Sequence, residues 1–387
     1  MDSYILTINV GSSSIKCSLF ERQILAPSST HKSLTNNTEL KFLWDKSAAY
    51  EKNDLENIDQ TISQLFRSSN IAAEQVNFVG HRIVHGGNKY FTATAVDDSV
   101  LKDLYSLVEL APQHQPANIK GIEATRKLFA QAKQIACFDT AYFHDLPQEA
   151  QIYAVPDSWY NELGIRRFGF HGISHQYAAQ QISLLLNKPL SELKIITCHL
   201  GSGSSLAAIK NGNPIMNTMG FTPMPGLIMR TRCGDIDSGI IFYLINQGKF
   251  SPSQLDTILN YESGLKGISQ LSGDMHELEI ESNKGNDKAT LAINCYLQNL
   301  SRQAGSLLPL LQGLDALVFT GGIGENSSLI RKKLCQSLSF LGLELNHTNN
   351  NCLPPDQDDA IISTLKSKVK VAVVKCREDI SIASQCQ

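Results

Sequence analysis

The sequence predicts an α/β protein built from two similar domains. The chain has 387 residues, a length that suits two domains better than one. A unit of strand, Gly/Ser turn and strand occurs twice, with Asn9-Val10-Gly11 matching His199-Leu200-Gly201, 190 residues later (199 − 9). Other apolar runs end in Gly or Asp, which is typical of α/β sheets that bind ligands beyond the carboxyl ends of their strands. Together these observations indicate a duplicated α/β fold.

The first copy of the repeated unit lies near the N-terminus. Tyr4–Val10 is predicted to form a strand, Gly11–Ser14 a tight turn and Ile15–Phe20 a second strand. Apolar and polar residues alternate along this second strand, as expected when one face is buried. The second copy is predicted to place strands at Leu193–His199 and Leu206–Lys210, on either side of a turn at Gly201–Ser205.

Three further strands and one helix are expected from short apolar runs. The strands are predicted at Ile135–Phe138, which ends before Asp139, at Ala316–Thr320, which precedes a Gly-rich segment, and at Val369–Val374. The spacing of leucines predicts a helix over Ser327–Ser339. Two mainly polar stretches, Asn36–Asp59 and Asn346–Asp359, are predicted to be surface segments.

The amino-acid composition argues against several classes of protein. The residues are 42% hydrophobic and 18% charged with a formal net charge of −3, which is ordinary for a globular protein and gives no reason to expect a nucleic-acid or membrane partner. The apolar runs are far shorter than the ~20 residues of a membrane span, and Met1–Val10 does not resemble a secretory signal. Nine cysteines without CxxC spacing favour free thiols in a reducing compartment, so we expect a cytoplasmic protein.

Both Gly/Ser turns are candidate phosphate-binding loops. Glycine lets the backbone approach a phosphate, and its N–H groups and the serine hydroxyls donate hydrogen bonds to the phosphate oxygens. Neither turn matches the P-loop or the dinucleotide fingerprint. A plain β-hairpin turn is the alternative interpretation of each.

Two arginines are candidates for binding an anion. Arg82 lies in Gly80–Gly87, and Arg232 lies in Met229–Asp235; each is two residues from a glycine. A guanidinium group donates two parallel hydrogen bonds to a carboxylate or a phosphoryl group. Arginines also lie commonly on solvated faces, so neither position alone decides the function.

Asp139 and Glu378 are candidate partners of magnesium, because each follows a predicted strand and Mg²⁺ prefers oxygen ligands. Glu378 is equally well interpreted as an acid favoured at a helix N-terminus. His171 lies among aromatic residues and glycines, where an imidazole could donate a hydrogen bond to developing negative charge. The alternative is a zinc site, since His171 and His175 are four residues apart, as are His81 and His85; the absence of HExxH argues against it.

These segments together resemble the acetate kinase family along nearly the whole chain. The matching stretches are Ile8–Lys16, His81–Gly87, Ala111–Asn118, Phe138–His144, Phe168–His175, His199–Ser205, Arg232–Asp237 and Thr320–Asn326. The resemblance implies the duplicated actin/sugar-kinase-like (ribonuclease H-like) fold with its active site in the interdomain cleft. It further implies the reversible reaction of ATP and acetate to ADP and acetyl phosphate, a Mg²⁺ requirement (with Mn²⁺ as an alternative) and a homodimer. The domains would be 1–145, with 376–387 returning to it, and 146–375.

The resemblance also assigns site residues by matching position. The catalytic group would be Arg82, Asp139, His171 and Arg232, and Asn9 and Glu378 would organise the metal ion. The acid would lie against Arg82, Val84, Gln113, Phe170 and Pro223, and His114 and His199 would lie near the phosphates. The residues expected to bind ATP are Ser12, Ser14, Lys16, His199, Leu200, Gly201, Ser202, Gly203, Asp274, Met275, His276, Gly322, Ile323, Gly324 and Asn326.

Five positions depart from the family pattern. Gln113 stands where leucine is usual in the pocket for the methyl group, which raises propionate or butyrate as the substrate instead of acetate. The others are Ser202 in the second phosphate turn, His276 at the adenosine pocket, and Pro225 and Arg230 near Arg232. A carboxylate is already ionised at neutral pH, so the predicted mechanism is direct in-line transfer without a general base, with Asp139 serving the metal ion. A non-catalytic ATP-binding switch of actin-like fold and a zinc hydrolase are the alternatives from other classes.

Overall fold

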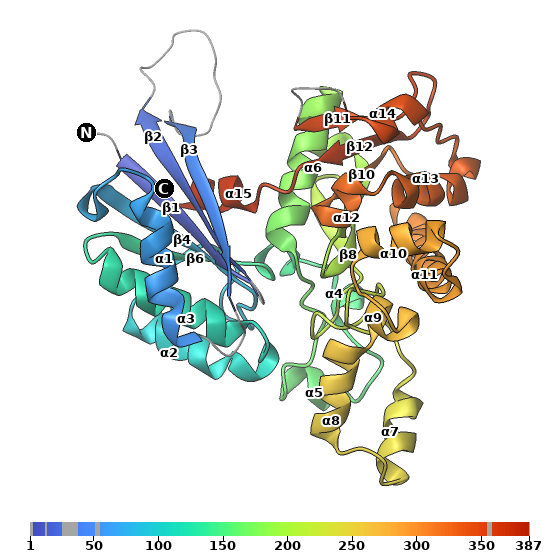
Figure 1. Cartoon of the computed structure of the whole chain (residues 1–387), viewed down its shortest axis with the longest axis horizontal. Helices are drawn as coiled ribbons and strands as arrows, with labels where there is room; N and C mark the ends of the chain where they lie inside the picture. The colour runs from blue at the N-terminus through green and yellow to red at the C-terminus, as the bar shows by residue number, and fades with distance from the viewer. Residues whose placement is uncertain (1–2, 12–13, 25–37, 51–54, 354–357, 387) are drawn as a thin grey trace. The chain divides into compact units, whose positions relative to one another are not determined.

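The computed structural model describes residues 3–11, 14–24, 38–50, 55–353 and 358–386. The chain forms two compact units: the first comprises Met1–Tyr142 with Arg377–Gln387, and the second comprises Phe143–Cys376. Each unit contains one six-stranded sheet with helices packed against it (Figure 1). Among the described residues, no helix combines the length and apolar character needed to cross a membrane.

The sheet of the first unit has the strand order β3-β2-β1-β4-β6-β5. Strands β1, β4 and β6 run parallel, and β2, β3 and β5 are antiparallel to their neighbours. The bounds of the strands are β1 Ser3–Val10, β2 Ser14–Ile24, β3 Thr38–Ala49, β4 Val76–Ile83, β5 Thr94–Ala95 and β6 Lys133–Phe138.

The sheet of the second unit repeats this arrangement, with the order β11-β12-β10-β7-β8-β9. Read from the other edge, each strand has a counterpart in the first sheet with the same direction: β7 corresponds to β1, β8 to β2 and β10 to β4. The predicted duplicated fold is therefore confirmed. The strands are β7 Lys194–Leu200, β8 Ser204–Lys210, β9 Asn213–Asn217, β10 Ala316–Thr320, β11 Asp359–Ile361 and β12 Lys370–Val374.

Helices cover both sheets. In the first unit, α1 and α3 pack on the strands and enclose a core that includes Ile8, Leu19 and Ile62. In the second, α11 lies against β7 and β8 over a core that includes Ile196 and Leu206, and α6 contacts β7 and β10. The bounds are α1 Ile58–Arg67, α2 Asp98–Ser106, α3 Gln115–Leu128, α4 Gln148–Gln151, α5 Asp157–Asn161, α6 Gly172–Leu186, α7 Ser238–Asn246, α8 Pro252–Thr257, α9 Gly264–Ser269, α10 Met275–Asn283, α11 Asp287–Leu311, α12 Gly321–Asn326, α13 Ser328–Ser337, α14 His347–Asn351 and α15 Glu378–Gln385.

As predicted, Asn36–Asp59 and Asn346–Asp359 are surface segments in their described parts, where Ile58 and Asn350 are the buried exceptions. Thr38–Ala49 forms the edge strand β3, because β2 offers a row of backbone hydrogen-bonding groups that a polar segment satisfies as well as an apolar one. Within the second stretch α14 forms, and Asn350 is only 1% exposed because the Arg331 guanidinium donates to it.

The last helix, α15, belongs to the first unit and packs against β1 and β4. Gly80 of β4 permits this close approach, since a Cβ at that position would lie 2.5 Å from Ile382 and 2.6 Å from the Cys386 sulfur. The packing brings the first residue of α15, Glu378, to the ends of β1 and β4.

Candidate active site

In the first unit, four predicted site residues gather at the carboxyl ends of neighbouring parallel strands. Arg82 lies near the end of β4, and Asp139 follows the last residue of β6. The Arg82 Nε donates to both carboxylate oxygens of Asp139 at 3.0 and 3.1 Å, and its Nη2 donates to Oδ2 at 2.7 Å. The Arg82 Nη1 lies 3.3 Å from Glu378 Oε2, to which Asn9 Nδ2 also donates at 3.1 Å. The structure therefore joins all four in one cluster.

This cluster holds Arg82 in place before any ligand binds. The Asp139 side chain is 1% exposed, that of Glu378 13% and that of Arg82 17%. A fork of charge-assisted hydrogen bonds to a buried carboxylate fixes the plane of the guanidinium group. Two carboxylates around one guanidinium leave the cluster with one net negative charge when all three groups are ionised.

The other predicted residues of the first unit lie around these strand ends. Val84 is buried, and its N–H donates to Asn118 Oδ1 while Asn118 Nδ2 donates to the Val10 carbonyl, so Asn118 joins the ends of β1 and β4. Gln113 and His114 are half-buried just before α3. The first Gly/Ser turn closes a β-hairpin through the Gly11 N–H and the Ser14 carbonyl. Ser14 is half-buried, Lys16 is exposed, and Ser12 lies outside the described residues.

In the second unit, His171 occupies a strained position at the start of α6. Its φ is 58°, the left-handed region that a residue with a side chain rarely adopts. Its Nδ1 hydrogen-bonds with Ser205 Oγ at 2.9 Å, and its ring stacks on that of His199 with centroids 4.2 Å apart. The Nδ1 of His199 hydrogen-bonds in turn with Ser174 Oγ at 2.8 Å. The imidazole of His171 is thus held from two sides.

His171 and Arg232 converge on Gly203 of the second Gly/Ser turn. A Cβ added to Gly203 would lie 2.6 Å from Arg232 Nη2 and 3.1 Å from His171 Nε2. The Arg232 Nη1 donates to the Pro223 carbonyl at 2.5 Å, which orients the guanidinium group. Like the first turn, this one closes a β-hairpin, with the Gly201 N–H donating to the Gly203 carbonyl at 3.0 Å. A guanidinium nitrogen and an imidazole nitrogen of the predicted catalytic group therefore face the same small space.

The histidine pairs proposed as zinc ligands have other partners. Ser205 Oγ lies between His171 Nδ1 and His175 Nε2, at 2.9 and 2.7 Å. The Nε2 of His81 hydrogen-bonds with Gln134 Oε1 at 2.9 Å. Burial lowers the pKa of His81 to about 4, against the smaller opposing effect of its hydrogen bond with Gln134. These contacts favour neutral, hydrogen-bonded imidazoles over a pair of metal ligands.

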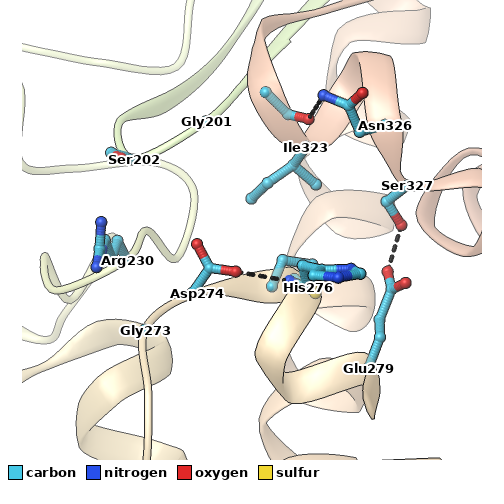
Figure 2. A pocket seen from close by; sticks show the side chains of 12 residues that line it. Gly201, Ser202, Arg230, Gly273, Asp274, His276, Glu279, Ile323, Asn326 and Ser327 are labelled. Atoms are coloured by element: carbon cyan, nitrogen blue, oxygen red, sulfur yellow. Dashed lines mark hydrogen bonds between the residues drawn. The ribbon is translucent and has the colours of Figure 1, made fainter.

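A cavity of about 480 Å³ in the second unit contains most of the residues predicted to bind adenosine (Figure 2). Of the predicted residues, it is lined by Gly201, Ser202, Asp274, Met275, His276, Gly322, Ile323 and Asn326. Sequence reasoning missed Gly273, Glu279 and Ser327, and noted Arg230 only as a departure. His199, Leu200, Gly203 and Gly324 do not line it; Leu200 and Gly324 are buried in the strand and helix behind it.

Helix ends and backbone hydrogen bonds shape this cavity. Asp274 caps α10 by accepting from the His276 N–H at 2.9 Å, which places the N-terminus of α10 at the wall. The Arg230 N–H donates to the Ser202 carbonyl at 3.2 Å, so Arg230 is fixed beside the Gly/Ser turn. Ser202, Arg230 and His276, all departures from the family pattern, are exposed residues of the cavity wall (Figure 2).

Comparison with known proteins identifies the family of the chain. The family model of the acetokinase family matches residues 4–384. The chain belongs to the acetokinase family. The acetate kinase of Microcystis aeruginosa is 48% identical over 311 residues, 80% of this chain and 77% of that protein. The acetate kinase of Acaryochloris marina is 41% identical over 401 aligned positions, 99% of this chain and 98% of that one.

Solved structures of the family share the fold. A Porphyromonas gingivalis acetate kinase superposes with a TM-score of 0.83 at 33% identity, over 99% of this chain and 98% of that one. A propionate kinase from Francisella tularensis superposes with a TM-score of 0.84 at 31% identity, with the same coverage. The predicted family and fold class are confirmed.

Proposed function

We propose that this protein is an acetate kinase, which transfers a phosphoryl group reversibly between ATP and acetate. The observation that carries the proposal is the convergence of Arg232 Nη2 and His171 Nε2 on Gly203, in a chain of the acetokinase family. Donors that face one small space suit the oxygens of a phosphoryl group in transfer. Family membership argues against a non-catalytic ATP-binding switch, which has no need for these donors.

The reaction requires little covalent chemistry from the protein. Acetate is ionised at neutral pH because carboxylic acids have a pKa near ~4, so no general base is needed. We assign the oxygens of the transferring group to Arg232 and His171 and the carboxylate to Arg82, whose guanidinium is held by Asp139 and Glu378. Catalysis then rests on positioning and on neutralising negative charge in direct in-line transfer.

The cluster in the first unit suits a magnesium ion. Asp139, Glu378 and Asn9 offer carboxylate and amide oxygens, the ligand type that Mg²⁺ and Mn²⁺ prefer, and the cluster is negatively charged overall. A bound ion would add charge neutralisation at the phosphate oxygens of ATP. Within the cluster, Arg82 keeps the two carboxylates close together by pairing with both.

The identity of the carboxylic acid substrate is the most specific part of the proposal. Val84 and Phe170 are buried, and Pro223 and the unusual Gln113 are half-buried. We expect acetate to be the preferred substrate among formate, acetate, propionate and butyrate when acyl phosphate is trapped as hydroxamate with ATP and Mg²⁺. A preference for propionate or butyrate would overturn the choice of acid. Formation of no acyl phosphate from any of the four would overturn the kinase itself.

Gly203→Ala is expected to lower kcat/KM by about 10²-fold, the loss typical of a catalytic group displaced by ~1 Å. The added Cβ would lie 2.6 Å from the Arg232 Nη2, and the end of this flexible side chain can move aside without unfolding the protein. Steady-state kinetics and the melting temperature measure the two effects. Gly305→Ala is the matched control, because a Cβ there meets nothing within 4 Å. Full activity of Gly203→Ala would contradict our placement of the phosphoryl group.

We assign the nucleoside of ATP to the cavity in Figure 2. Gly322→Leu is expected to raise the KM for ATP at least tenfold, the effect of ~1.4 kcal/mol, because its side chain would fill the cavity. A Cβ at Gly322 meets nothing within 4 Å, so the melting temperature and the KM for acetate should change little. An unchanged KM for ATP would place the nucleoside elsewhere.

We also propose that the protein is a cytoplasmic homodimer. Helix α7 is apolar on every side, a pattern normally found in buried helices, yet none of its residues is buried in one chain. Phe242 is 64% and Tyr243 59% exposed, and Figure 1 shows α7 far from the second sheet. A second copy of the chain would cover this helix. Sedimentation velocity should give a dimer, and a monomer at micromolar concentration would contradict it. The nine free thiols suit the reducing cytoplasm.

A further inference from the structure

A chain of buried polar side chains leads from the second sheet to His171. Thr197 Oγ1 on β7 lies 2.7 Å from His175 Nδ1, His175 Nε2 lies 2.7 Å from Ser205 Oγ, and Ser205 Oγ lies 2.9 Å from His171 Nδ1. Thr197, His175 and Ser205 are 0% exposed, and His171 is 8% exposed. None of the first three has a role in the function proposed above.

The Ser205 hydroxyl links the protonation of the two histidines that it joins. It carries one proton, so it can donate to one facing nitrogen and must accept from the other. If it accepted from both, its own buried proton would need a third partner, and no other hydrogen bond of the Ser205 side chain exists within the described residues. Therefore one of the two nitrogens, His171 Nδ1 or His175 Nε2, carries a proton and the other does not.

His175 is neutral and carries a single proton. Its burial lowers its pKa well below the usual value, and the neighbouring charge of His199 lowers it further. If the proton is on Nε2, His175 donates to Ser205 and its Nδ1 accepts from the Thr197 hydroxyl. If the proton is on Nδ1, His175 donates to Thr197 instead, and every hydrogen bond in the chain reverses.

The Thr197 hydroxyl decides between these two directions. In the first direction the Thr197 hydroxyl donates to His175, so every proton in this series of hydrogen bonds has an acceptor. In the second it accepts from His175, and its own proton needs another acceptor. Among the described residues, the Thr197 side chain has no hydrogen-bond partner other than His175. A buried hydroxyl without an acceptor is unfavourable, so the first direction is preferred.

We infer that Thr197, His175 and Ser205 are positioning residues that keep His171 Nδ1 free of a proton and so place the proton of the neutral imidazole on Nε2. This Nε2 is the nitrogen that faces Gly203 beside Arg232. His171 can then donate a hydrogen bond to an anion there without being positively charged. The inference rests on the proposed function for its purpose, since the anion would be the transferring phosphoryl group.

The first test measures the tautomer directly in the ligand-free protein. We expect the ¹⁵N spectrum of histidine-labelled protein to show a non-protonated Nδ1 and a protonated Nε2 for His171, assigned by its loss in His171→Gln. A protonated Nδ1, or rapid averaging between the tautomers, would overturn the inference. Because no substrate is present, this result does not depend on whether the protein makes acetyl phosphate.

Thr197→Val removes the hydroxyl and keeps the shape of the side chain. His175 Nδ1 then lacks a partner in both directions, so we expect a mixture of His171 tautomers and a kcat lowered roughly tenfold, with the KM for ATP unchanged within about twofold. Thr197→Ser should restore both the single tautomer and kcat. An unchanged tautomer in Thr197→Val would overturn the inference, even if stability fell.

Thr7→Val is the matched control. Thr7 lies on β1 at the position that corresponds to Thr197 on β7, is 3% exposed, and donates only weakly, at 3.4 Å, to the Ser18 carbonyl. The same change there should alter neither the His171 tautomer nor kcat. If the wild-type protein makes no acyl phosphate but shows the expected tautomer, the proposed function fails and the hydrogen-bond chain stands.

Discussion

Arg232→Ala is expected to lower kcat/KM by about 10³–10⁵-fold, the range seen when an arginine that neutralises a transferring phosphoryl group is removed. The Pro223 carbonyl fixes the guanidinium group of Arg232, and its Nη2 faces Gly203 beside His171 Nε2. Removing the group leaves His171 without its neighbouring positive charge at Gly203. The loss should be mainly in kcat, because the interaction strengthens in the transition state.

Arg232→Lys is the informative comparison. A lysine keeps the positive charge but lacks the planar fork, and so it should recover only part of the lost rate. Since Arg232 is half-buried and its Nη1 donates to a backbone carbonyl, both variants should melt within a few degrees of the wild type. Near-normal turnover by Arg232→Ala would rule out its role in transfer.

Arg82→Ala is expected to damage stability as well as activity. Arg82 is the partner of Asp139, whose side chain is 1% exposed, so the substitution leaves a buried carboxylate without its counter-charge. Breaking a buried ion pair from one side costs about 3–5 kcal/mol, which should be visible as a lower free energy of unfolding of the first unit. Activity should fall too, because the proposed carboxylate contact is lost.

A double substitution separates these two effects. Adding Asp139→Asn to Arg82→Ala removes the unpaired charge, so most of the lost stability should return while activity stays low. Denaturant unfolding followed by circular dichroism measures the stability, and the hydroxamate assay measures the activity. If Arg82→Ala alone unfolds like the wild type, the ion pair contributes less than its burial indicates.

Much of the fold could be predicted because its strands and turns produce recognisable residue patterns in short stretches of sequence. The strands around Val10 and Leu200 alternate or end in glycine, and their recurrence half a chain apart indicated the duplication that the strand order shows. The strand β3 could not be found this way. It mixes polar residues with apolar ones such as Phe42 and Trp44, and its structure depends on pairing with β2, a tertiary contact that no short window of sequence contains.

The site was predictable where it follows strand ends. Arg82 and Asp139 lie at neighbouring strand ends, which explains why reasoning from short motifs found them. The spacing of His171 and His175 suggested a zinc pair, whereas in the structure the Ser205 hydroxyl lies between the two rings. Thr197 gave no signal of its own and Ser205 was noted only as part of the second Gly/Ser turn, because a buried hydroxyl has meaning only beside the imidazole that it contacts. Glu279 and Ser327 were missed because their place in the cavity wall depends on tertiary structure.

The two sheets share one strand order, but different residue types stand at corresponding positions of their strands. At corresponding positions, β1 carries Thr7 and Asn9 where β7 carries Thr197 and His199. Asn9 contacts an acid in one copy, whereas His199 stacks on another imidazole in its counterpart. The candidate site of the first copy therefore contains carboxylates around Arg82, and that of the second contains imidazoles beside Arg232. Each unit therefore serves as a reference for the other. A comparison of corresponding positions shows which residue type the other copy carries in the same place.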